Sequence, residues 1–246
     1  MTKVGVIGAG GAMGRLACAA VRDADDFELA AEIGRGDPLE ALQGLDVAID
    51  LTHPGVVMDH VGWCIDHGVH VVVGTSGFTE ERLDEVRRRL SESPEVAVFV
   101  VPNFSIGAVL MMRFAAEAAG LFESVEIVEM HHPDKRDAPS GTALRTAQLV
   151  TEARRRAGRA PSPDATGEDE LGARGARAED VAVHSLRIRG AVAHQEVLLG
   201  NPGELLSLRH DMLDRAAAMP GLLACVRAAP TARGLVVGLD EILMRH

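Results

Sequence analysis

The feature that most constrains the fold is an apolar strand that runs directly into a glycine-rich turn near the start of the chain. Val4-Gly5-Val6-Ile7 is followed by Gly8-Ala9-Gly10-Gly11-Ala12-Met13-Gly14, and an apolar helical pattern then continues through Val21. Glycines permit a tight turn and let a pyrophosphate approach the amides at a helix N-terminus. The turn is not a strict GxGxxG, so a purely structural tight turn is the alternative. Its place between a strand and a helix favours a dinucleotide site.

Short apolar runs alternate with helical patterns through the first part of the chain. We predict further strands near 27–33, 47–51, 69–73 and 96–101. Such alternation is typical of a parallel sheet, which binds its ligands at the carboxyl ends of the strands. Besides Gly8, Gly11, Ala12, Met13 and Gly14, the candidate cofactor residues at these ends are Leu51, Thr52, Gly74, Thr75, Ser76, Pro102, Asn103 and Phe104.

The pattern changes after Ser105. We predict a helix over 106–120, a strand over 125–130 and a helix over 142–157, followed by a long loop over 159–180 that is rich in Pro, Gly and charge. Three further runs are predicted to form antiparallel strands, with turns at Gly190 and at Asn201-Pro202-Gly203: 181–188, 191–199 and 205–209. A helix over 214–228 and a strand from Leu235 follow.

These elements predict an α/β protein with two domains. Residues 1–105 and 215–246 are expected to form a Rossmann-type, parallel-sheet dinucleotide-binding domain. Residues 106–214 are expected to form an inserted α+β domain that binds the substrate.

Composition excludes several classes of function. A net charge of −11 over 246 residues argues against nonspecific nucleic-acid binding, which needs a basic surface. No apolar run approaches the roughly 20 residues of a membrane span, and the N-terminus lacks the layout of a secretory signal. Three scattered cysteines make neither a disulfide framework nor a metal site. We therefore expect a cytoplasmic protein with reduced, buried thiols and no membrane partner.

The segment from His131 to Ala143 concentrates the chemistry. His131 and His132 end a strand, Lys135 follows in a turn, and Ser140-Gly141-Thr142 begins a helix. The imidazole can donate a proton near neutral pH, the ammonium can stabilise an oxyanion or carboxylate, and the helix start suits a carboxylate. Ser140 could equally be a plain N-cap.

The remaining histidines point to no second site. Adjacent strand residues face opposite sides and no third ligand is evident, so the His131–His132 pair predicts no metal site. His184, His194 and His210 are expected to have interior polar or surface roles. Four others are expected at the surface around a helix: His53, His60, His67 and His70.

The residue that reads the cofactor ribose should end the second strand, about 20 residues beyond the glycine turn. The chain reads Glu32-Ile33-Gly34-Arg35 there, so no acid stands at position 34 to take both ribose hydroxyls. Arg35 could instead bind a 2′-phosphate, which favours NADPH. The alternative is a solvated loop arginine.

Several motifs together resemble one enzyme family. They are Gly8 to Gly14, Asp50-Leu51-Thr52-His53-Pro54, Gly74-Thr75-Ser76-Gly77, Pro102 to Gly107, Glu129 through Ala143, and Ala193 to Val197. Over nearly its whole length the chain resembles the 4-hydroxy-tetrahydrodipicolinate reductase (dihydrodipicolinate reductase) family of lysine and diaminopimelate biosynthesis. The His-His…Lys…Ala-Pro-Ser-Gly-Thr-Ala segment is the most specific of these motifs.

The resemblance implies a Rossmann-type cofactor domain and an inserted domain whose sheets pack into a homotetramer. It further implies that His131 is the acid/base, that Lys135 is a donor, and that His132, Ser140, Gly141 and Thr142 hold the substrate. Two departures bear on the cofactor. Family members often carry a basic residue in the glycine turn and an acid at the end of the second strand, where this chain has Gly10, Ala12 and Gly34.

The predicted reaction is hydride transfer from NADPH, with NADH also accepted, to a double bond conjugated with a ring imine in a small cyclic dicarboxylate. Two other functions stay open from sequence. One is a different two-domain NAD(P)-dependent dehydrogenase, acting for example on an amino-acid semialdehyde or a sugar. The other is a catalytically silent dinucleotide sensor, which would have no need for His131 and Lys135 together.

Overall fold

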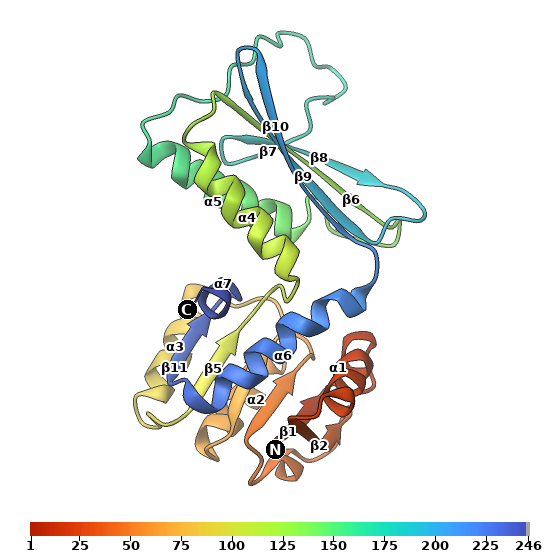
Figure 1. Ribbon diagram of the computed structural model, residues 1–246, viewed down its shortest axis with the longest axis vertical. Coiled ribbons are helices and arrows are strands. Elements are labelled where there is room, and N and C mark those ends of the chain that lie inside the picture. Colours follow the sequence, from red (N-terminus) through yellow and green to blue (C-terminus); the bar gives the residue numbers. More distant parts are fainter. Residues whose placement is uncertain (245–246) are drawn as a thin grey trace. The chain divides into compact units, whose positions relative to one another are not determined.

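The computed structural model describes residues 1–244. The chain divides into two compact units, residues 1–106 with the tail from Ala218, and Gly107–Ala217. The domain boundaries predicted from the sequence lie between residues 105 and 106 and between residues 214 and 215. The elements, coloured along the chain in Figure 1, are β1 (Thr2–Ile7), α1 (Ala12–Asp23), β2 (Phe27–Ile33), η1 (Leu39–Leu42), β3 (Val47–Asp50), α2 (Val57–Asp66), β4 (His70–Val73), α3 (Glu80–Leu90), β5 (Ala97–Val100), α4 (Ile106–Ala119), β6 (Ser124–His131), α5 (Gly141–Arg156), β7 (Ala176–Ala178), β8 (Val181–Arg187), β9 (Ala193–Asn201), β10 (Glu204–Met212), η2 (Arg215–Ala218), α6 (Met219–Ala228), η3 (Ala229–Thr231), β11 (Gly234–Val237) and α7 (Asp240–Leu243).

The first unit is the predicted parallel α/β domain. Its sheet has the order β11-β5-β4-β3-β1-β2, and every pair in it is parallel. Helices α1 and α6 contact one another, as do α2 and α3. The strand order reverses between β1 and β3, which is the point where open parallel sheets bind ligands. The Rossmann-type prediction is confirmed.

The apolar runs form strands because both faces of this sheet are covered. All four residues of β3 and of β5 are buried, so these strands show continuous hydrophobicity instead of alternation. The C-terminal tail returns to this unit as predicted, and β11 pairs with β5. A Cβ on Gly221 of α6 would lie 2.1 Å from the Phe104 carbonyl oxygen, so only glycine permits this close approach.

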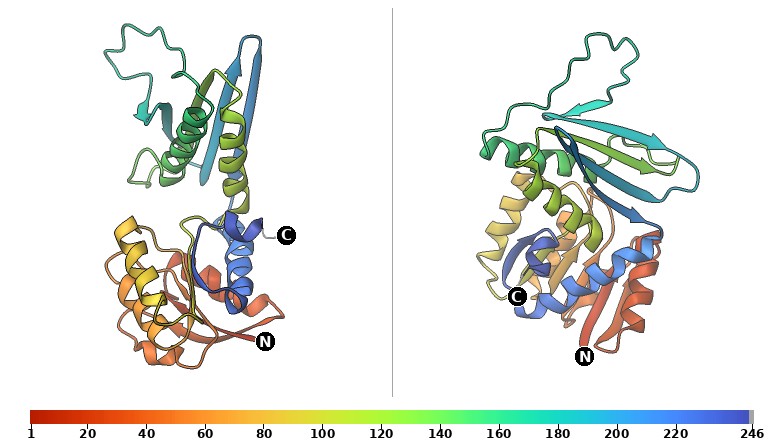
Figure 2. Two further views of the ribbon diagram at one scale, coloured as in Figure 1. Left: turned by 90° about the vertical axis from the view of Figure 1, so that its left-hand side faces the viewer. Right: turned by 45° about the horizontal axis from the view of Figure 1, so that its top comes forward.

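The second unit is a five-stranded mixed sheet, β10-β9-β6-β8-β7, with α4 and α5 on one face (Figures 1 and 2). Burial alternates along β6, where Val125 and Ile127 join the core with Ala143 and Ala147 of α5. Glu129 follows the same period and therefore lies on the helix-covered face, where it is fully buried.

One predicted pairing is wrong. The turn at Gly190 was expected to join two antiparallel neighbours, but β6 lies between β8 and β9, and β6 and β8 are parallel. The turn at Asn201-Pro202-Gly203 does join an antiparallel pair, β9 and β10. Local turn signals identify a change of direction but not which strand lies next to which.

The predicted loop over 159–180 is long, and it contains the short strand β7, which sequence missed (Figure 2). Side chains tie the loop to the rest of its unit. The Arg154 guanidinium donates to the carbonyl oxygens of Phe122 (2.8 Å) and Ala160 (2.7 Å), and the Val125 amide donates to the Ser162 hydroxyl at 3.1 Å. The loop is thus held at its start, next to β6.

Candidate active site

The glycine turn follows β1 and bonds to the end of the neighbouring strand β2. Gly8 has φ of +84°, a region that favours glycine, and its amide and that of Ala9 donate to the Ile33 carbonyl at 2.8 and 3.1 Å. A Cβ on Gly14 would lie 2.0 Å from the Gly8 carbonyl oxygen, so helix α1 can start this close to the turn only with glycine there. Gly11 and Ala12, at the helix start, are exposed, and Met13 is half-buried.

The start of α1 fits an anionic cofactor. Its N-cap, Gly11, provides no side-chain hydrogen bond, and its first turn contains no acidic residue. By contrast, α3 begins with a Thr79 cap and two glutamates. The first amides of α1 therefore face solvent without the usual side-chain acceptor, as a pyrophosphate site requires. Arg15 adds a guanidinium that donates to the Gly10 carbonyl, a cation at the turn that sequence reasoning missed.

A buried carboxylate organises the neighbouring loops. Asp50, at the end of β3, is 0% exposed. It accepts hydrogen bonds from the Thr52 amide (3.0 Å), the Thr52 hydroxyl (2.7 Å) and the Thr75 hydroxyl (2.9 Å). His60 Nδ1 lies 2.7 Å from its other oxygen. Asp50 thus joins two predicted cofactor residues on adjacent loops.

Most of the other predicted cofactor residues gather at the same strand ends. A Cβ on Gly74 would lie 2.6 Å from the Phe104 ring and 2.7 Å from Leu51, so these three residues are in close contact. Asn103 Oδ1 accepts a hydrogen bond from the Ser105 amide at 2.9 Å. Ser76, in the loop after β4, and Pro102, in the loop after β5, are exposed. The structure therefore brings the loops after β1, β3, β4 and β5 to one edge of the sheet.

Arg35 lies in the turn after β2, and the same turn contains a carboxylate that sequence reasoning missed. The Gly34 amide donates to Asp37 Oδ2 at 2.7 Å, and a Cβ at position 34 would lie 3.1 Å from that oxygen. Position 34 has no acid of its own, but Asp37 folds back and places a carboxylate there. Its signal in the sequence was an Asp four residues beyond the strand, just after Gly36, which has a φ of +85° in this turn.

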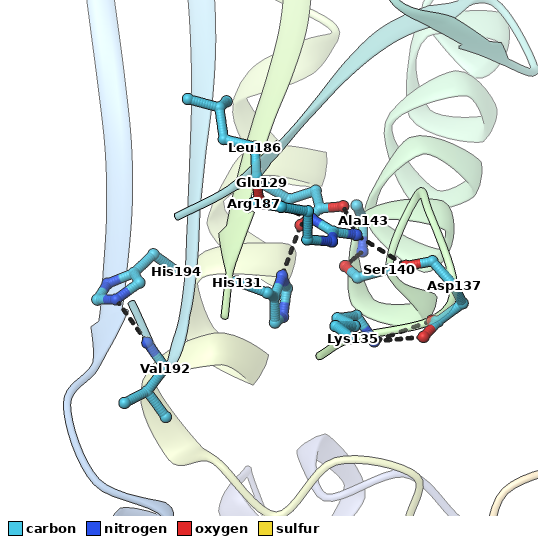
Figure 3. Close-up of polar contacts among 10 residues, drawn as sticks. All are labelled: Glu129, His131, Lys135, Asp137, Ser140, Ala143, Leu186, Arg187, Val192 and His194. Atoms are coloured by element: carbon cyan, nitrogen blue, oxygen red, sulfur yellow. Dashed lines mark hydrogen bonds and ion pairs between the residues drawn. The ribbon is translucent and has the colours of Figure 1, made fainter. Parts of the chain in front are cut away.

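His131 forms a pair with buried Glu129. His131 Nδ1 lies 2.5 Å from Glu129 Oε2, and the imidazole is 14% exposed (Figure 3). Burial lowers the pKa of His131; Glu129 opposes this shift, whereas the charges of Lys135 and Arg187 add to it. Because Nδ1–H donates its hydrogen bond to the carboxylate, Nε2 is the ring nitrogen left to exchange a proton with a ligand.

Arg187 of β8 holds the same carboxylate. Its two terminal nitrogens donate to the two Glu129 oxygens, each at 2.9 Å. Burial alone would raise the pKa of Glu129, but hydrogen bonds from Arg187, Ser185 and His131 hold it below its usual value. Glu129 is therefore an anion at neutral pH, and its charge is balanced by Arg187.

Lys135 joins this network through Asp137. The ammonium donates to the two carboxylate oxygens of Asp137 at 2.8 and 2.9 Å, and Arg187 donates to the Asp137 carbonyl at 2.7 Å. The contacts therefore run from His131 through Glu129, Arg187 and Asp137 to Lys135 (Figure 3). The Lys135 amide donates to the His132 carbonyl at 3.2 Å, which closes the turn between them.

The first turn of α5 lies beside the residues that connect His131 to Lys135 (Figure 3). Ser140 is buried and caps the helix, accepting the Ala143 amide at 3.2 Å. Gly141 is exposed and Thr142 half-buried in the first turn, where no acidic residue stands. The Thr142 carbonyl accepts the Thr146 hydroxyl at 2.8 Å, and Gln195 Nε2 donates to Thr146 Oγ1 at 2.7 Å. Gln195 thus anchors this helix start to β9, a role that sequence reasoning missed.

His132 stands at the edge of the cluster. Its side chain is 32% exposed and Nδ1 lies 4.0 Å from the Asp134 carboxylate. His53 and His67 are exposed as expected, but the surface prediction is wrong for two other histidines. His60 is half-buried against Asp50, and His70 accepts the Ala97 amide at 3.0 Å between two strands of the core.

Other kinds of site were sought within residues 1–244. No group of three or more His, Cys, Asp or Glu side chains there is arranged to hold a metal ion. Nor does this part of the chain contain a helix long and apolar enough to span a bilayer. The three cysteines are buried and unpaired, and burial raises the pKa of Cys18 to about 11 and those of Cys64 and Cys225 to about 12. Such thiols are poor nucleophiles.

Comparison with known proteins identifies the family. The model described as "Dihydrodipicolinate reductase, N-terminus" matches residues 2–104, and the one described as "Dihydrodipicolinate reductase, C-terminus" matches residues 107–243. The chain belongs to the dihydrodipicolinate reductase family. The resemblance inferred from the sequence motifs is confirmed.

Individual relatives cover the whole chain. A 4-hydroxy-tetrahydrodipicolinate reductase of Nocardia farcinica is 56% identical over 243 residues, 98% of each protein. One of Streptomyces coelicolor is 54% identical, covering 98% of this chain and 97% of the relative. A dipicolinate-bound dihydrodipicolinate reductase from Paenisporosarcina sp. TG-14 superposes with a TM-score of 0.86 at 36% identity, over 98% of this chain and 99% of that one.

Proposed function

We propose that this protein reduces 4-hydroxy-tetrahydrodipicolinate to tetrahydrodipicolinate with NAD(P)H, a step of lysine and diaminopimelate biosynthesis. The full-length similarity to reductases that bear this name supports the proposal. The observation that carries it furthest is the connected set His131, Glu129, Arg187, Asp137 and Lys135 beside the first turn of α5. A proton donor, a cation and a carboxylate-binding helix start are the groups that reduction of a cyclic dicarboxylate requires.

The first unit is proposed to hold the cofactor. The uncapped first turn of α1 would bind the pyrophosphate, and Thr52 and Thr75, fixed by Asp50, would line the neighbouring loops with Leu51, Gly74 and Phe104. The bound nicotinamide supplies a hydride. Both cofactors are proposed to work with NADPH preferred, because Arg35 can pair with a 2′-phosphate, while the Asp37 carboxylate keeps that preference modest.

The second unit is proposed to hold the substrate and to control the proton. The amides of Gly141 and Thr142, with Ser140 as their cap, would bind one carboxylate, and His132 would contact the substrate. Lys135 would stabilise the negative charge that develops when the double bond is reduced. His131, protonated on Nε2, would then deliver a proton to the ring, so the active form of His131 is the imidazolium.

The protein is further proposed to form a homotetramer through the sheet of the second unit. Both long helices of that unit lie on one face, so the opposite face remains without such a cover (Figure 1). Apolar side chains lie on this opposite face, and Leu186 and Leu205 are 42% and 70% exposed. An apolar sheet face of this kind is typical of a subunit interface. We also propose a cytoplasmic location, where unpaired thiols persist.

A spectrophotometric assay tests the function directly. The purified protein should oxidise NADPH and NADH in the presence of freshly generated 4-hydroxy-tetrahydrodipicolinate, and pyridine-2,6-dicarboxylate should inhibit it competitively. Cofactor oxidation with another carbonyl substrate, and none with this one, would favour a different dehydrogenase. Tight cofactor binding without turnover of any of these substrates would favour a sensor.

A further inference from the structure

Arg187 contacts both halves of the proposed proton-transfer machinery. Its terminal nitrogens donate to both oxygens of Glu129, and one of them also donates to the Asp137 carbonyl at 2.7 Å. Glu129 bonds to His131, and Asp137 bonds to Lys135. These partners lie on β6 and in the loop that follows it, so Arg187 of β8 joins two consecutive segments from which it is separated by 58 residues (to Glu129) and 50 residues (to Asp137) of chain.

Charge neutralisation alone does not account for this geometry. A buried carboxylate needs one compensating charge, which a lysine could supply. Arg187 presents a planar fork with several donors, and it uses them on two acceptors that lie on different segments. The side chain is 21% exposed and Glu129 is 0% exposed, so water competes little for these bonds.

We propose that Arg187 is a positioning residue for both proton transfer and charge stabilisation, because it locks Glu129 against Nδ1 of His131 and fixes the turn that carries Lys135. Glu129 is a second positioning residue, which keeps the proton on Nδ1 of His131 so that Nε2 faces the substrate. The inference rests on the proposed roles of His131 and Lys135. Neither Arg187 nor Glu129 is proposed to touch the substrate.

The charges around His131 give the proposal a distinctive signature. Glu129 on its own strand favours the imidazolium, whereas Arg187 of β8 and Lys135 of the following turn disfavour it. On the other neighbouring strand, β9, His194 is paired with Asp211 of β10 at 2.7 Å. Removing Glu129 and removing Arg187 should therefore move the titration of His131 in opposite directions.

The first experiment measures kcat/KM against pH for the wild type, Glu129→Gln and Arg187→Met. Activity requires protonated His131, so it falls as pH rises through the pKa of that group. The falling limb should move to lower pH in Glu129→Gln, which loses a favourable charge and leaves Arg187 unpaired. It should move to higher pH in Arg187→Met, which leaves the Glu129 charge uncompensated. Shifts in the same direction, or none, would overturn the proposal.

A matched control lies on the same strand. Glu126 also pairs with a histidine, His184, at 2.7 Å, and with an arginine, Arg174, but on the opposite face of the sheet. Glu126→Gln should leave the limb where the wild type has it. If Glu126→Gln moved the limb as far as Glu129→Gln does, the effect would be a general one of removing an acid from this sheet.

The second experiment reads the His131 ring without using activity. Nitrogen NMR of protein labelled in histidine, with the His131 signals assigned by their absence in His131→Asn, should show neutral His131 protonated on Nδ1 in the wild type. In Glu129→Gln the fraction protonated on Nε2 should increase, because the amide can donate to Nδ1. An unchanged tautomer would contradict the role of Glu129.

The third experiment tests the Lys135 half by coupling. Lys135→Ala should lower kcat/KM by about 10- to 100-fold in the wild type, the range expected for one charged hydrogen bond. It should lower kcat/KM only a few-fold in an Arg187→Met background, where the turn is no longer fixed. It should keep its full effect in a Glu126→Gln background. Equal effects in all three backgrounds would mean that Arg187 does not position Lys135.

A milder variant covers the case in which Arg187→Met does not fold. Arg187→Lys retains the charge but cannot bond Glu129 and Asp137 together, so the limb should stay near its wild-type pH while the Lys135 coupling is lost.

His131→Ala separates the proposed acid role of His131 from the proposed positioning role of Arg187. If it leaves kcat unchanged, the acid role itself is wrong; if it abolishes activity while the variants above behave like wild type, only the role of Arg187 is wrong.

Discussion

Both units of the molecule bury a carboxylate completely beside a histidine, near the carboxyl end of a strand, but they compensate it in different ways. Asp50 in the first unit is surrounded by two threonine hydroxyls, an amide and His60. Glu129 in the second is held by the fork of Arg187 as well as by His131. Uncharged donors fix the geometry of loops, whereas an arginine also sets the local electrostatic potential.

The difference fits the proposed tasks of the two units. A cofactor site needs loops held in one arrangement, and Asp50 joins the loops after β3 and β4 through Thr52 and Thr75. A proton donor needs a pKa near the working pH. Burial lowers the pKa of His131, Glu129 opposes that shift, and the charges of Lys135 and Arg187 add to it. We therefore interpret Asp50–His60 as a structural pair and Glu129–His131 as a chemical one.

The two histidines give the strongest test of this interpretation. His131→Ala should lower kcat by about 10²–10⁴-fold, the usual contribution of general acid–base catalysis, with the dissociation constant of NADPH unchanged. His60→Ala should leave kcat within a few-fold of the wild type and weaken NADPH binding. Steady-state kinetics and cofactor titration measure both. Similar losses of kcat in the two variants would remove the distinction between the pairs.

Substitution of Asp50 should mainly affect stability and cofactor binding. Asp50→Ala leaves two hydroxyls and an imidazole without their acceptor, and we expect the free energy of unfolding to fall by several kcal/mol, since each buried donor left unsatisfied costs about 1–3 kcal/mol. Asp50→Asn keeps one carbonyl oxygen for the threonines and should lose less. Urea denaturation with and without NADPH measures both effects. An Asn variant as unstable as the Ala variant would contradict the hydroxyl-acceptor role.

Effects on the substrate should be confined to residues of the second unit. Lys135→Ala should lower kcat/KM by about one to two decades, since a charged hydrogen bond contributes roughly 1.5–3 kcal/mol. Thr142→Val should weaken pyridine-2,6-dicarboxylate without changing NADPH affinity, and His132→Ala should chiefly raise KM. Calorimetric titration with the dicarboxylate provides the check. Undiminished binding to both Lys135→Ala and Thr142→Val would place the carboxylate site elsewhere.

Cofactor choice should depend on two opposed residues of the first unit. We expect NADPH to be preferred over NADH by about ten-fold, the order that one charged contact gives. Arg35→Ala should erase this preference and leave NADH kinetics almost unchanged. Asp37→Asn, which keeps an acceptor for the Gly34 amide but removes the charge, should increase the preference. Equal losses with both cofactors in Arg35→Ala would mean that Arg35 supports the loop instead.

The smallest expected effect is a pH dependence of stability that arises from His70. Burial, together with the charge of Arg233, lowers the pKa of His70 below its usual value of about 6.5. The unfolded chain therefore binds this proton more readily, so the stabilising contribution is present above that pH and is lost as pH falls below it. The free energy of unfolding should decrease less steeply between pH 7.5 and 5.5 in His70→Gln, as denaturation curves at several pH values can show. Parallel pH dependences would exclude His70 as a source.

Sequence reasoning succeeded where a local pattern determined the outcome. The glycine turn, the parallel sheet and the cap at Ser140 follow from spacing of a few residues. It missed the roles of Asp50 and Glu129 because a charged residue in a strand usually faces solvent, and because the partners lie far away in the chain. Thr75 is 25 residues from Asp50, and Arg187 is 58 residues from Glu129.

The same limit explains the wrong strand pairing. A glycine at position 190 indicates a turn, but the hydrophobic pattern of β8 cannot show whether β9 or β6 lies beside it. The parallel pairing of β6 with β8 is also what places Arg187 across from His131, in register. Sequence reasoning therefore predicted His131 as a site residue but could not show that Arg187 lies next to it.

The contact of Arg187 with Glu129 also limits how this protein can evolve. A buried anion that loses its cation costs several kcal/mol, which is a large share of the stability of a typical domain. Replacing Arg187 alone passes through such a state, and replacing Glu129 alone leaves the part-buried guanidinium without its acceptor, whereas an exchange of both for uncharged residues avoids both states. Among descendants of this chain, positions 129 and 187 should therefore be kept together or replaced together, while exposed neighbours such as Asp134 drift independently.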